Sequence, residues 1–171
     1  MTTDANFDFA GLYGRHAPGV FRYALFLCGD RMQAEDIVSE TFVRVWGARD
    51  RVDLSSVRSY LLAIARNVFL QGVRRRRREG PLEDGMAEAV ADPSPRPDAS
   101  HQVSAELARA MAALATLPES DRTALLLRVD EELGYDDIAT ILGITPVAAR
   151  VKVHRARARL AQMRKDTGSC M

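Results

Sequence analysis

The sequence predicts an all-α protein built as two small helical domains joined by a flexible acidic linker. Apolar residues recur at helical spacing along most of the 171-residue chain, and no stretch of useful length alternates as a strand would. Four prolines and six acidic residues interrupt this pattern between Glu79 and Ser100. We therefore expect a first domain over residues 1–79, a linker over 80–101, a second domain over 102–165 and a tail over 166–171.

The formal net charge of +1 hides two concentrated blocks of positive charge. Of the 24 Lys and Arg residues, five are consecutive from Arg74 to Arg78, and seven lie between Pro146 and Lys165. Such blocks form separate positive patches that can displace counterions from phosphates. This segregation favours nucleic acid as a partner.

The composition argues against several other classes of protein. Two cysteines, Cys28 and Cys170, form neither a disulfide framework nor a metal-binding spacing. The three histidines, His16, His101 and His154, are far apart and lack ligand or acid–base partners at suitable spacing. No apolar run is long enough to span a bilayer, and the amino terminus lacks the layout of a signal peptide. We therefore expect a cytoplasmic protein that is not an enzyme, without cofactor, metal or membrane insertion.

The first domain begins with an apolar helical pattern over Phe7–Cys28, which Pro18 should break or kink. Asp30, with Gln33 three residues later, predicts the capped start of a helix that runs to about Ala48. One face of this helix is an apolar stripe formed by Ile37, Val38, Thr41, Phe42, Val45 and Trp46. The opposite face holds Asp36, Ser39, Glu40 and Val43. It is an acidic face that is either plain solvated surface or a docking surface.

The next segment, Arg49–Ser56, is polar and should be a loop that caps a helix beginning near Val57. That helix ends in the five consecutive arginines. A helix C-terminus favours cations, but five adjacent positive charges repel one another, so we favour a phosphate partner. Asn67 is intrinsically unfavourable in mid-helix. It either faces solvent or hydrogen-bonds a base edge.

The second domain should contain four helices. A stripe of Val103, Leu107, Ala110, Met111 and Leu114 forms the first. Leu117-Pro118 begins the second, with Glu119 and Asp121 in its first turn, a buried face of Leu125, Leu126 and Val129, and its end at Gly134.

The last two helices form a predicted helix-turn-helix. Tyr135–Leu142 is a short apolar-striped helix, and Gly143 follows as a C-terminal stop. Thr145 can cap the next helix, and Pro146 suits its first position. In this motif the second helix enters the DNA major groove.

The second helix of the motif has a basic outer face. We expect Ala148 and Val151 to face the core and Arg150, His154 and Arg155 to point outward. A basic C-terminal helix is also common as solvated surface that complements its own dipole. The capped turn before the charges favours DNA binding over that alternative.

Two motif sets together identify a family resemblance. QAEDIVSETFVRVW followed by SYLLAIARNVFLQGVRRRRR, an acidic linker and then LPESDRTALLLRVDEELGYDDIATILGITPVAARVKVHRARARL resembles a bacterial extracytoplasmic-function (ECF) sigma factor. The resemblance covers nearly all of the chain. It implies an alternative sigma factor that binds core RNA polymerase and directs promoter-specific initiation.

The resemblance also implies roles for residues of both domains. In the first domain, region 2, the positions that match polymerase-binding ones are Asp36, Ser39, Glu40, Phe42 and Trp46. The loop Arg49–Ser56 and the helix after it match the segments that open the minus-ten element, and the expected DNA contacts there are Tyr60, Arg66, Asn67, Arg74, Arg75 and Arg76. In the second domain, region 4, the helix that reads the minus-thirty-five element contributes Thr145, Pro146, Arg150, Val151, Lys152, His154 and Arg155.

The resemblance further implies an anti-sigma factor, often membrane-bound, that covers the polymerase-binding faces. Two other functions stay open from the residues alone. A freestanding helix-turn-helix regulator would bind DNA without polymerase. An enzyme acting on nucleic acid would need metal or acid–base groups, and the sequence shows none at suitable spacing.

Overall fold

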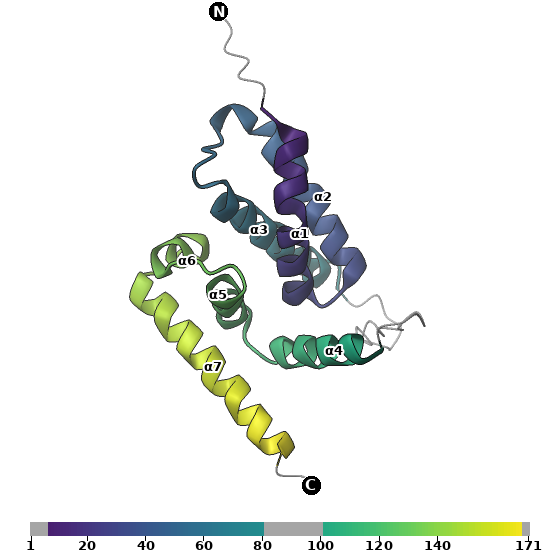
Figure 1. The fold of residues 1–171 in the computed structure, drawn as a ribbon, viewed down its shortest axis with the longest axis vertical. Coiled ribbons are helices and arrows are strands. Elements are labelled where there is room, and N and C mark those ends of the chain that lie inside the picture. The colour runs from purple at the N-terminus through teal and green to yellow at the C-terminus, as the bar shows by residue number, and fades with distance from the viewer. Residues whose placement is uncertain (1–6, 81–100, 169–171) are drawn as a thin grey trace, which may run out of the picture.

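The computed structural model describes residues 7–80 and 101–168, and within them every regular element is helical (Figure 1). The prediction of an all-α fold is therefore confirmed. The elements are α1 (Phe9–Cys28), α2 (Arg31–Gly47), the 3₁₀ turn η1 (Arg49–Arg51), α3 (Val57–Arg78), α4 (His101–Ala115), α5 (Glu119–Val129), α6 (Tyr135–Leu142) and α7 (Pro146–Gly168). The expected acidic linker lies mostly outside the described residues.

Helices α1, α2 and α3 pack against one another as an amino-terminal module. Short acidic caps begin the first two helices: Asp8 accepts the Gly11 N–H at 2.8 Å, and Asp30 accepts the Gln33 N–H at 2.7 Å. The second of these confirms the predicted start of α2.

Of the two alternatives at Pro18, a break into two helices is wrong, because α1 continues through it as one helix. Residues buried on both sides of Pro18, including Leu12 and Tyr23, lie on one core-facing side, while Pro18 itself is exposed. Burial of that shared face holds the helix together despite the lost backbone hydrogen bond.

The apolar stripe of α2 is confirmed except at its end. Phe42 is 2% exposed and Thr41 is fully buried, whereas Trp46 is 48% exposed. The Thr41 hydroxyl donates to the Ile37 carbonyl at 2.6 Å, so its burial leaves no unpaired polar group. The acidic side of α2 faces solvent as predicted.

Helices α5, α6 and α7 form the centre of a carboxy-terminal module, with α4 beside them. The buried face of α5 differs from the prediction. Leu125, Leu126 and Leu127 are all buried, whereas Val129 is 55% exposed. Helix α5 contacts α6, α7 and α1, so three successive leucines find partners and Val129 falls on the remaining open side.

Helix α5 also ends five residues earlier than expected. It stops at Val129, and the turn that follows contains Glu132 with φ 56°. The stripe of α4 is only partly buried: Leu114 is 8% exposed, whereas Leu107 is 37% exposed. Short helices at the edge of a small module leave part of their apolar face to solvent.

The helix-turn-helix forms as predicted. Gly143 adopts the left-handed conformation, with φ 67°, that ends α6. Thr145 caps α7 by accepting the Ala148 N–H at 3.1 Å, and Pro146 is the first helical residue.

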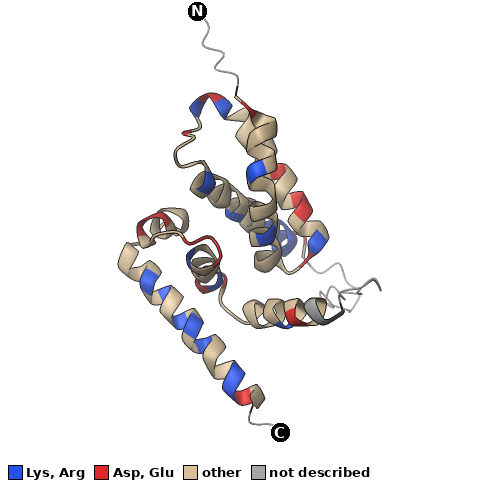
Figure 2. Ribbon diagram, in the orientation of Figure 1, with Lys and Arg blue, Asp and Glu red and all other residues tan. Residues whose placement is uncertain are grey.

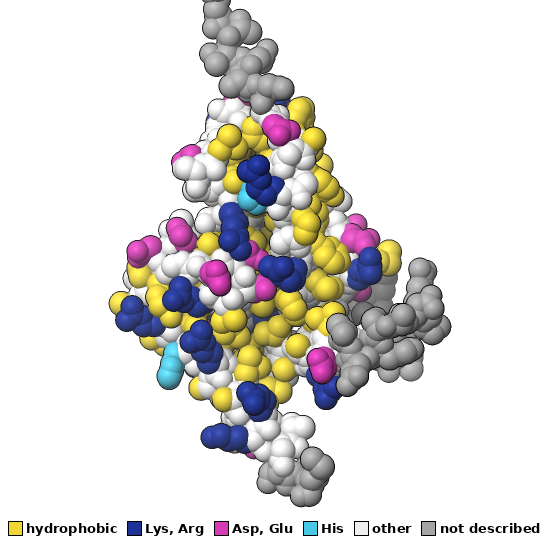
Figure 3. All heavy atoms as spheres, in the orientation of Figure 1, with side chains coloured by type: hydrophobic (Ala, Val, Ile, Leu, Met, Phe, Trp, Pro, Cys, Tyr) yellow, Lys and Arg dark blue, Asp and Glu magenta, His cyan; other side chains and the backbone are white. Residues whose placement is uncertain are grey.

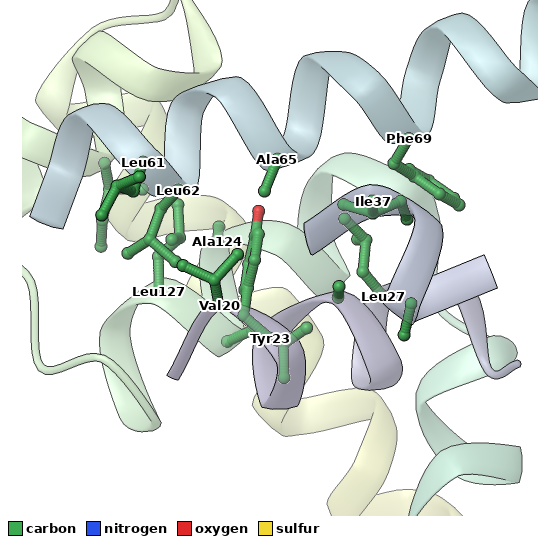
Figure 4. Close-up of a cluster of buried hydrophobic side chains, with 14 of the residues drawn as sticks. Val20, Tyr23, Leu27, Ile37, Leu61, Leu62, Ala65, Phe69, Ala124 and Leu127 are labelled. Carbon is green, nitrogen blue, oxygen red and sulfur yellow. The ribbon is translucent and has the colours of Figure 1, made fainter. Parts of the chain in front are cut away.

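The two modules contact each other, which the sequence did not predict. Tyr23 of α1 inserts between the modules, its hydroxyl end directed at Ala65 of α3 (Figure 4). Ala124 and Leu127 of α5 lie in the same cluster, and both are fully buried. One apolar cluster therefore joins α5 to α1 and α3.

Candidate nucleic-acid interface

Helix α7 presents a cationic outer face to solvent. The residues that hold it on its module are Ala149, Val153 and Ala156, each at most 1% exposed. Their spacing of four and three residues places Arg150, His154 and Arg155 outside, as predicted. Lys and Arg residues run along α7 in Figure 2 and are spaced over the lower part of the face in Figure 3.

Two details of this face correct the sequence analysis. Val151 does not face the core, because it lies two residues from Ala149 and so almost on the opposite side of the helix; it is 46% exposed. Ala148 is only half-buried. The exposed Val151, together with Val147 at 73% exposed, adds apolar surface between the cations.

Lys152 lies on the inner side of this face and is engaged within the protein. Its ammonium donates to the Ser120 hydroxyl at 2.9 Å and to the Asp121 carboxylate at 3.3 Å, both at the start of α5. Asp121 is buried, with 5% of its side chain exposed. In this arrangement Lys152 neutralises a buried carboxylate and fixes α7 against α5, so its contact with DNA stays a prediction.

Arg150 lies over an aromatic ring. Its guanidinium carbon is 5.2 Å from the ring centroid of Tyr135, the first residue of α6. Arg128 of α5 approaches the same ring at 4.9 Å and donates to the Leu133 carbonyl at 3.0 Å. Neither Tyr135 nor Arg128 is among the predicted DNA contacts, because both residues come close to Arg150 only through the fold.

A second group of predicted DNA contacts follows α3. Tyr60 is 38% exposed, and Asn67 faces solvent. Arg74 and Arg75 are exposed on the last turns, where Arg75 lies 3.9 Å from Glu79. Arg76 is placed to donate to the side-chain amide oxygen of Gln33 on α2. The run of arginines from Arg74 to Arg78 therefore forms an exposed cationic surface, which Arg76 connects to α2.

Arg66, also predicted to meet DNA, is instead turned toward the other module. Its Nε and Nη2 donate to the two carboxylate oxygens of Glu119 at 2.9 and 3.0 Å. The Arg66 side chain is 12% exposed. In this arrangement a bidentate ion pair occupies Arg66, so it does not face DNA here.

Three further ion pairs join the modules. Arg58 of α3 donates twice to one oxygen of Glu131, at 2.9 and 2.6 Å, and the Glu131 side chain is 2% exposed. Arg22 of α1 donates to Asp130 at 2.9 Å and lies 3.6 Å from the other oxygen of Glu131. In all four pairs the cation belongs to the amino-terminal module and the carboxylate to the carboxy-terminal one. The contact between modules is therefore electrostatically complementary as well as apolar.

A cleft of about 240 Å³ lies beside these pairs, with His16 in its wall. Burial, Arg15 and Arg58 lower the pKa of His16 below its ordinary value. The cleft is thus a place where an added positive charge is disfavoured.

The loop between α2 and α3 is organised by Asp53. Its carboxylate accepts the Ser55 N–H at 2.9 Å and the Ser55 hydroxyl at 2.7 Å, and these bonds lower the pKa of Asp53. Ser56 stands at the start of α3 but makes no side-chain capping bond, so the predicted cap is wrong. At the other end of the loop, Arg49 lies over the Trp46 ring at 4.8 Å.

The outer face of α2 is the candidate protein-binding surface. Asp36, Ser39 and Glu40 are exposed, and Glu40 accepts from Arg44 at 2.7 Å. Phe42 is buried against Phe9 and Tyr13 and is therefore not on the exposed face in this arrangement, so its contact with a partner stays a prediction. Ser39 and Phe42 are three positions apart on α2, but Ser39 is exposed whereas Phe42 points toward the core.

A groove of about 380 Å³ runs beside this acidic face, between α1 and α2. Its walls combine apolar and polar side chains, and the residues are Tyr13, Gly14, Ala17, Pro18, Phe21, Glu35, Val38 and Ser39. The sequence did not predict this groove, because its two walls come from different helices.

Two family models match the chain in the order that the modules take. Sigma-70 region 2 matches residues 12–79, and Sigma-70 region 4 matches residues 107–160. The ECF RNA polymerase sigma factor SigM of Bacillus subtilis is 30% identical over 150 residues, which cover 87% of this chain and 90% of SigM. This chain belongs to the ECF sigma factors.

Other relatives agree. SigE of Mycolicibacterium smegmatis is 35% identical over 152 residues, and the match spans 87% of this chain but 58% of SigE. The sigma factor RpoE of Bartonella quintana, solved in complex with the anti-sigma factor NepR, has a TM-score of 0.74 at 26% identity and covers 92% of this chain and 97% of that one. The structure of CnrH, at 24% identity and a TM-score of 0.70, shows the same fold.

As an ECF sigma factor, the chain is an alternative sigma factor that binds core RNA polymerase and directs promoter-specific transcription initiation. Region 2 beside region 4 sets it apart from a freestanding helix-turn-helix regulator. Among the described residues there is no helix both long and apolar enough to cross a membrane. Within the same residues, no cluster of three or more His, Cys, Asp or Glu side chains is placed to hold a metal ion.

Proposed function

We propose that this sigma factor reads promoter DNA with two surfaces and docks on polymerase with a third. The observation that carries the proposal is the outer face of α7, where Arg150, His154 and Arg155 stand exposed around Val151 on a capped, groove-sized helix. This face would read the minus-thirty-five element. Thr145 and Pro146 at the start of α7 lie where a helix N-terminus approaches a phosphate.

The minus-ten surface would be the loop before α3 together with the exposed side of that helix. Tyr60 offers a ring on which an unstacked base can stack, and Asn67 offers both a donor and an acceptor for its pairing edge. Arg74 and Arg75 would follow the backbone phosphates.

Core polymerase would dock on the outer face of α2, through Asp36, Ser39 and Glu40, with the half-exposed Trp46 at the end of this helix. The apolar groove between α1 and α2 extends this surface. An acidic rim beside apolar walls suits a helical partner with basic and apolar residues.

The described arrangement of modules would have to open for Arg66 to meet DNA. Arg66 and Arg58 both lie on α3. Arg66 donates two hydrogen bonds to Glu119, and Arg58 donates two to Glu131. These carboxylates satisfy the cations that phosphates would otherwise meet. We propose that promoter binding separates the carboxy-terminal module from α1 and α3.

An anti-sigma factor is the expected regulator, because the similar sigma factor RpoE of Bartonella quintana was solved in complex with the anti-sigma factor NepR. We propose that such a partner covers the groove beside α2. The chain would act in the cytoplasm, with no catalysis, cofactor or metal of its own.

Promoter titrations test the reading surface. Arg150→Ala should cost about 1–3 kcal/mol against the preferred minus-thirty-five sequence, and should flatten the response to single-base changes at one position. Arg159→Ala, further along α7, is the control for a phosphate-type cation. If both variants weaken all sequences equally, α7 contributes charge but does not read bases.

A further inference from the structure

We propose that Tyr135 is a positioning residue for promoter reading: its ring holds the Arg150 guanidinium in the orientation that meets a base. The proposal rests on the proposed role of α7 at the minus-thirty-five element. It adds a residue from α6, the first helix of the motif, to the determinants of sequence selectivity.

The geometry supports a cation–π contact. The Arg150 guanidinium carbon lies 5.2 Å from the ring centroid, within the distance at which a cation is attracted by an aromatic face. Among the described residues, the structure shows no hydrogen bond or ion pair to this guanidinium. The Tyr135 ring is therefore the contact that defines where the exposed Arg150 side chain lies.

The ring itself is held firmly. Tyr135 is half-buried and packs against the core of its module. Arg128 covers the ring at 4.9 Å and is tied to the Leu133 carbonyl at 3.0 Å, just before α6 begins. A fixed ring can restrain the mobile end of a long side chain.

This restraint leaves the hydrogen-bonding edge of Arg150 available. A guanidinium carries its five N–H donors in its own plane, so stacking one face on a ring does not occupy them. Two of these donors can meet O6 and N7 of a guanine together. Because the ring has already removed part of the rotamer freedom, less is lost when the base is bound.

The first test uses the free protein and needs no DNA. Relaxation of the Arg150 ¹⁵Nε–¹H group should show larger motion in Tyr135→Leu than in the original protein. Tyr135→Leu keeps an apolar side chain but removes the aromatic face. Tyr135→Phe keeps the face and should leave Arg150 unchanged.

The second test measures selectivity. Binding of holoenzyme to promoters with single-base changes at the minus-thirty-five element gives a discrimination ratio at each position. Tyr135→Leu should reduce the Arg150-dependent ratio about two- to fivefold, the range of an exposed cation–π contact. Tyr135→Phe should stay within about twofold of the original protein. Tyr135→Leu combined with Arg150→Ala should match Arg150→Ala alone.

A third series separates positioning from packing. Should Tyr135→Leu lower the melting temperature of the module, phenylalanines with increasing fluorine substitution at position 135 keep the ring shape and weaken its negative face. A discrimination ratio that falls stepwise with fluorination supports the proposal. A ratio that does not change along the series overturns it.

The outcomes also distinguish this inference from the function on which it rests. Full selectivity in Tyr135→Leu, with loss in Arg150→Ala, overturns the role of Tyr135 and leaves the reading role of α7 intact. Unchanged selectivity in Arg150→Ala overturns both. In that case, the relaxation of Arg150 in the free protein still shows whether the ring contact exists.

Discussion

Neutralising Glu131 should open the contact between the two modules. Glu131 is 2% exposed and accepts two hydrogen bonds from Arg58, while Arg22 lies 3.6 Å from its other oxygen. Glu131→Gln keeps the shape of the side chain and removes its charge, so it tests the ion pairs with little change in packing.

The magnitude follows from the two bonds to Arg58. Hydrogen bonds to charged groups contribute about 1.5–3 kcal/mol each, and neutral ones about half as much. Because the Arg58 side chain is 50% exposed, water replaces part of the loss, and we discount the total by about half. The expected shift is about 0.8–1.5 kcal/mol, or roughly 4- to 13-fold in the ratio of closed to open molecules.

Pulsed electron–electron double resonance would measure the ratio of closed to open molecules. Nitroxide labels at the exposed Met32 and Ala158, with Cys28 and Cys170 replaced by Ser, report the distance between modules. Glu131→Gln should add a broad population at longer distance. Raising salt from about 0.05 to about 1 M should have a smaller effect in the same direction in the original protein, because partly buried pairs at contact distance are only weakly screened by salt.

Glu106→Gln, an exposed acid on α4, is the matched control and should leave the distances unchanged. If Glu131→Gln gives the same distance distribution as the original protein, with its helical content intact, then the ion pairs do not hold the modules together. The proposed opening on promoter binding would lose its basis.

Three further predictions follow from other contacts. Lys152→Met should destabilise the carboxy-terminal module by about 1–3 kcal/mol in urea unfolding, because it leaves the buried Asp121 carboxylate unpaired. Adding Asp121→Asn to Lys152→Met should recover part of the loss. Equal stability of Lys152→Met and the original protein would show that the pair does not stabilise the module. Glu40→Arg should weaken co-elution with core polymerase by about tenfold while the fold persists, with Glu106→Arg as control, and undiminished co-elution would remove α2 from the docking surface. His16 shares its cleft with Arg15, Arg22, Arg58 and Glu131, and its folded-state pKa is below the ordinary 6.5. The folded state therefore binds this proton less readily than the unfolded state, and the free energy of unfolding should fall as pH drops below about 6.5. His16→Gln should flatten that part of the stability curve, and an unchanged slope would assign the pH dependence to other groups.

The sequence predicted those parts of the fold that depend on neighbours in the chain. The cap of α2 at Asp30, the left-handed Gly143 and the Thr145 cap of α7 each involve residues at most four positions apart. The outward direction of Arg150 follows equally from helical period.

Contacts between distant residues were beyond this reasoning. Arg66 and Glu119 are 53 positions apart, and Lys152 and Asp121 are 31 apart. The local sequence around an Arg or Lys does not distinguish a side chain that binds DNA from one that pairs with a carboxylate on another helix. The burial of Phe42 was expected from the apolar stripe of α2, but its aromatic partners were not, since they come from α1.

Initiation by a reconstituted holoenzyme tests the central claim most directly. This chain, mixed with core RNA polymerase and a library of promoters randomised at both elements, should co-elute with the enzyme and yield transcripts from a defined subset. Arg150→Ala should change the preferred minus-thirty-five bases alone, and Asn67→Ala the preferred minus-ten bases alone. Failure to co-elute with core enzyme, or transcripts that do not depend on either element, would contradict the account.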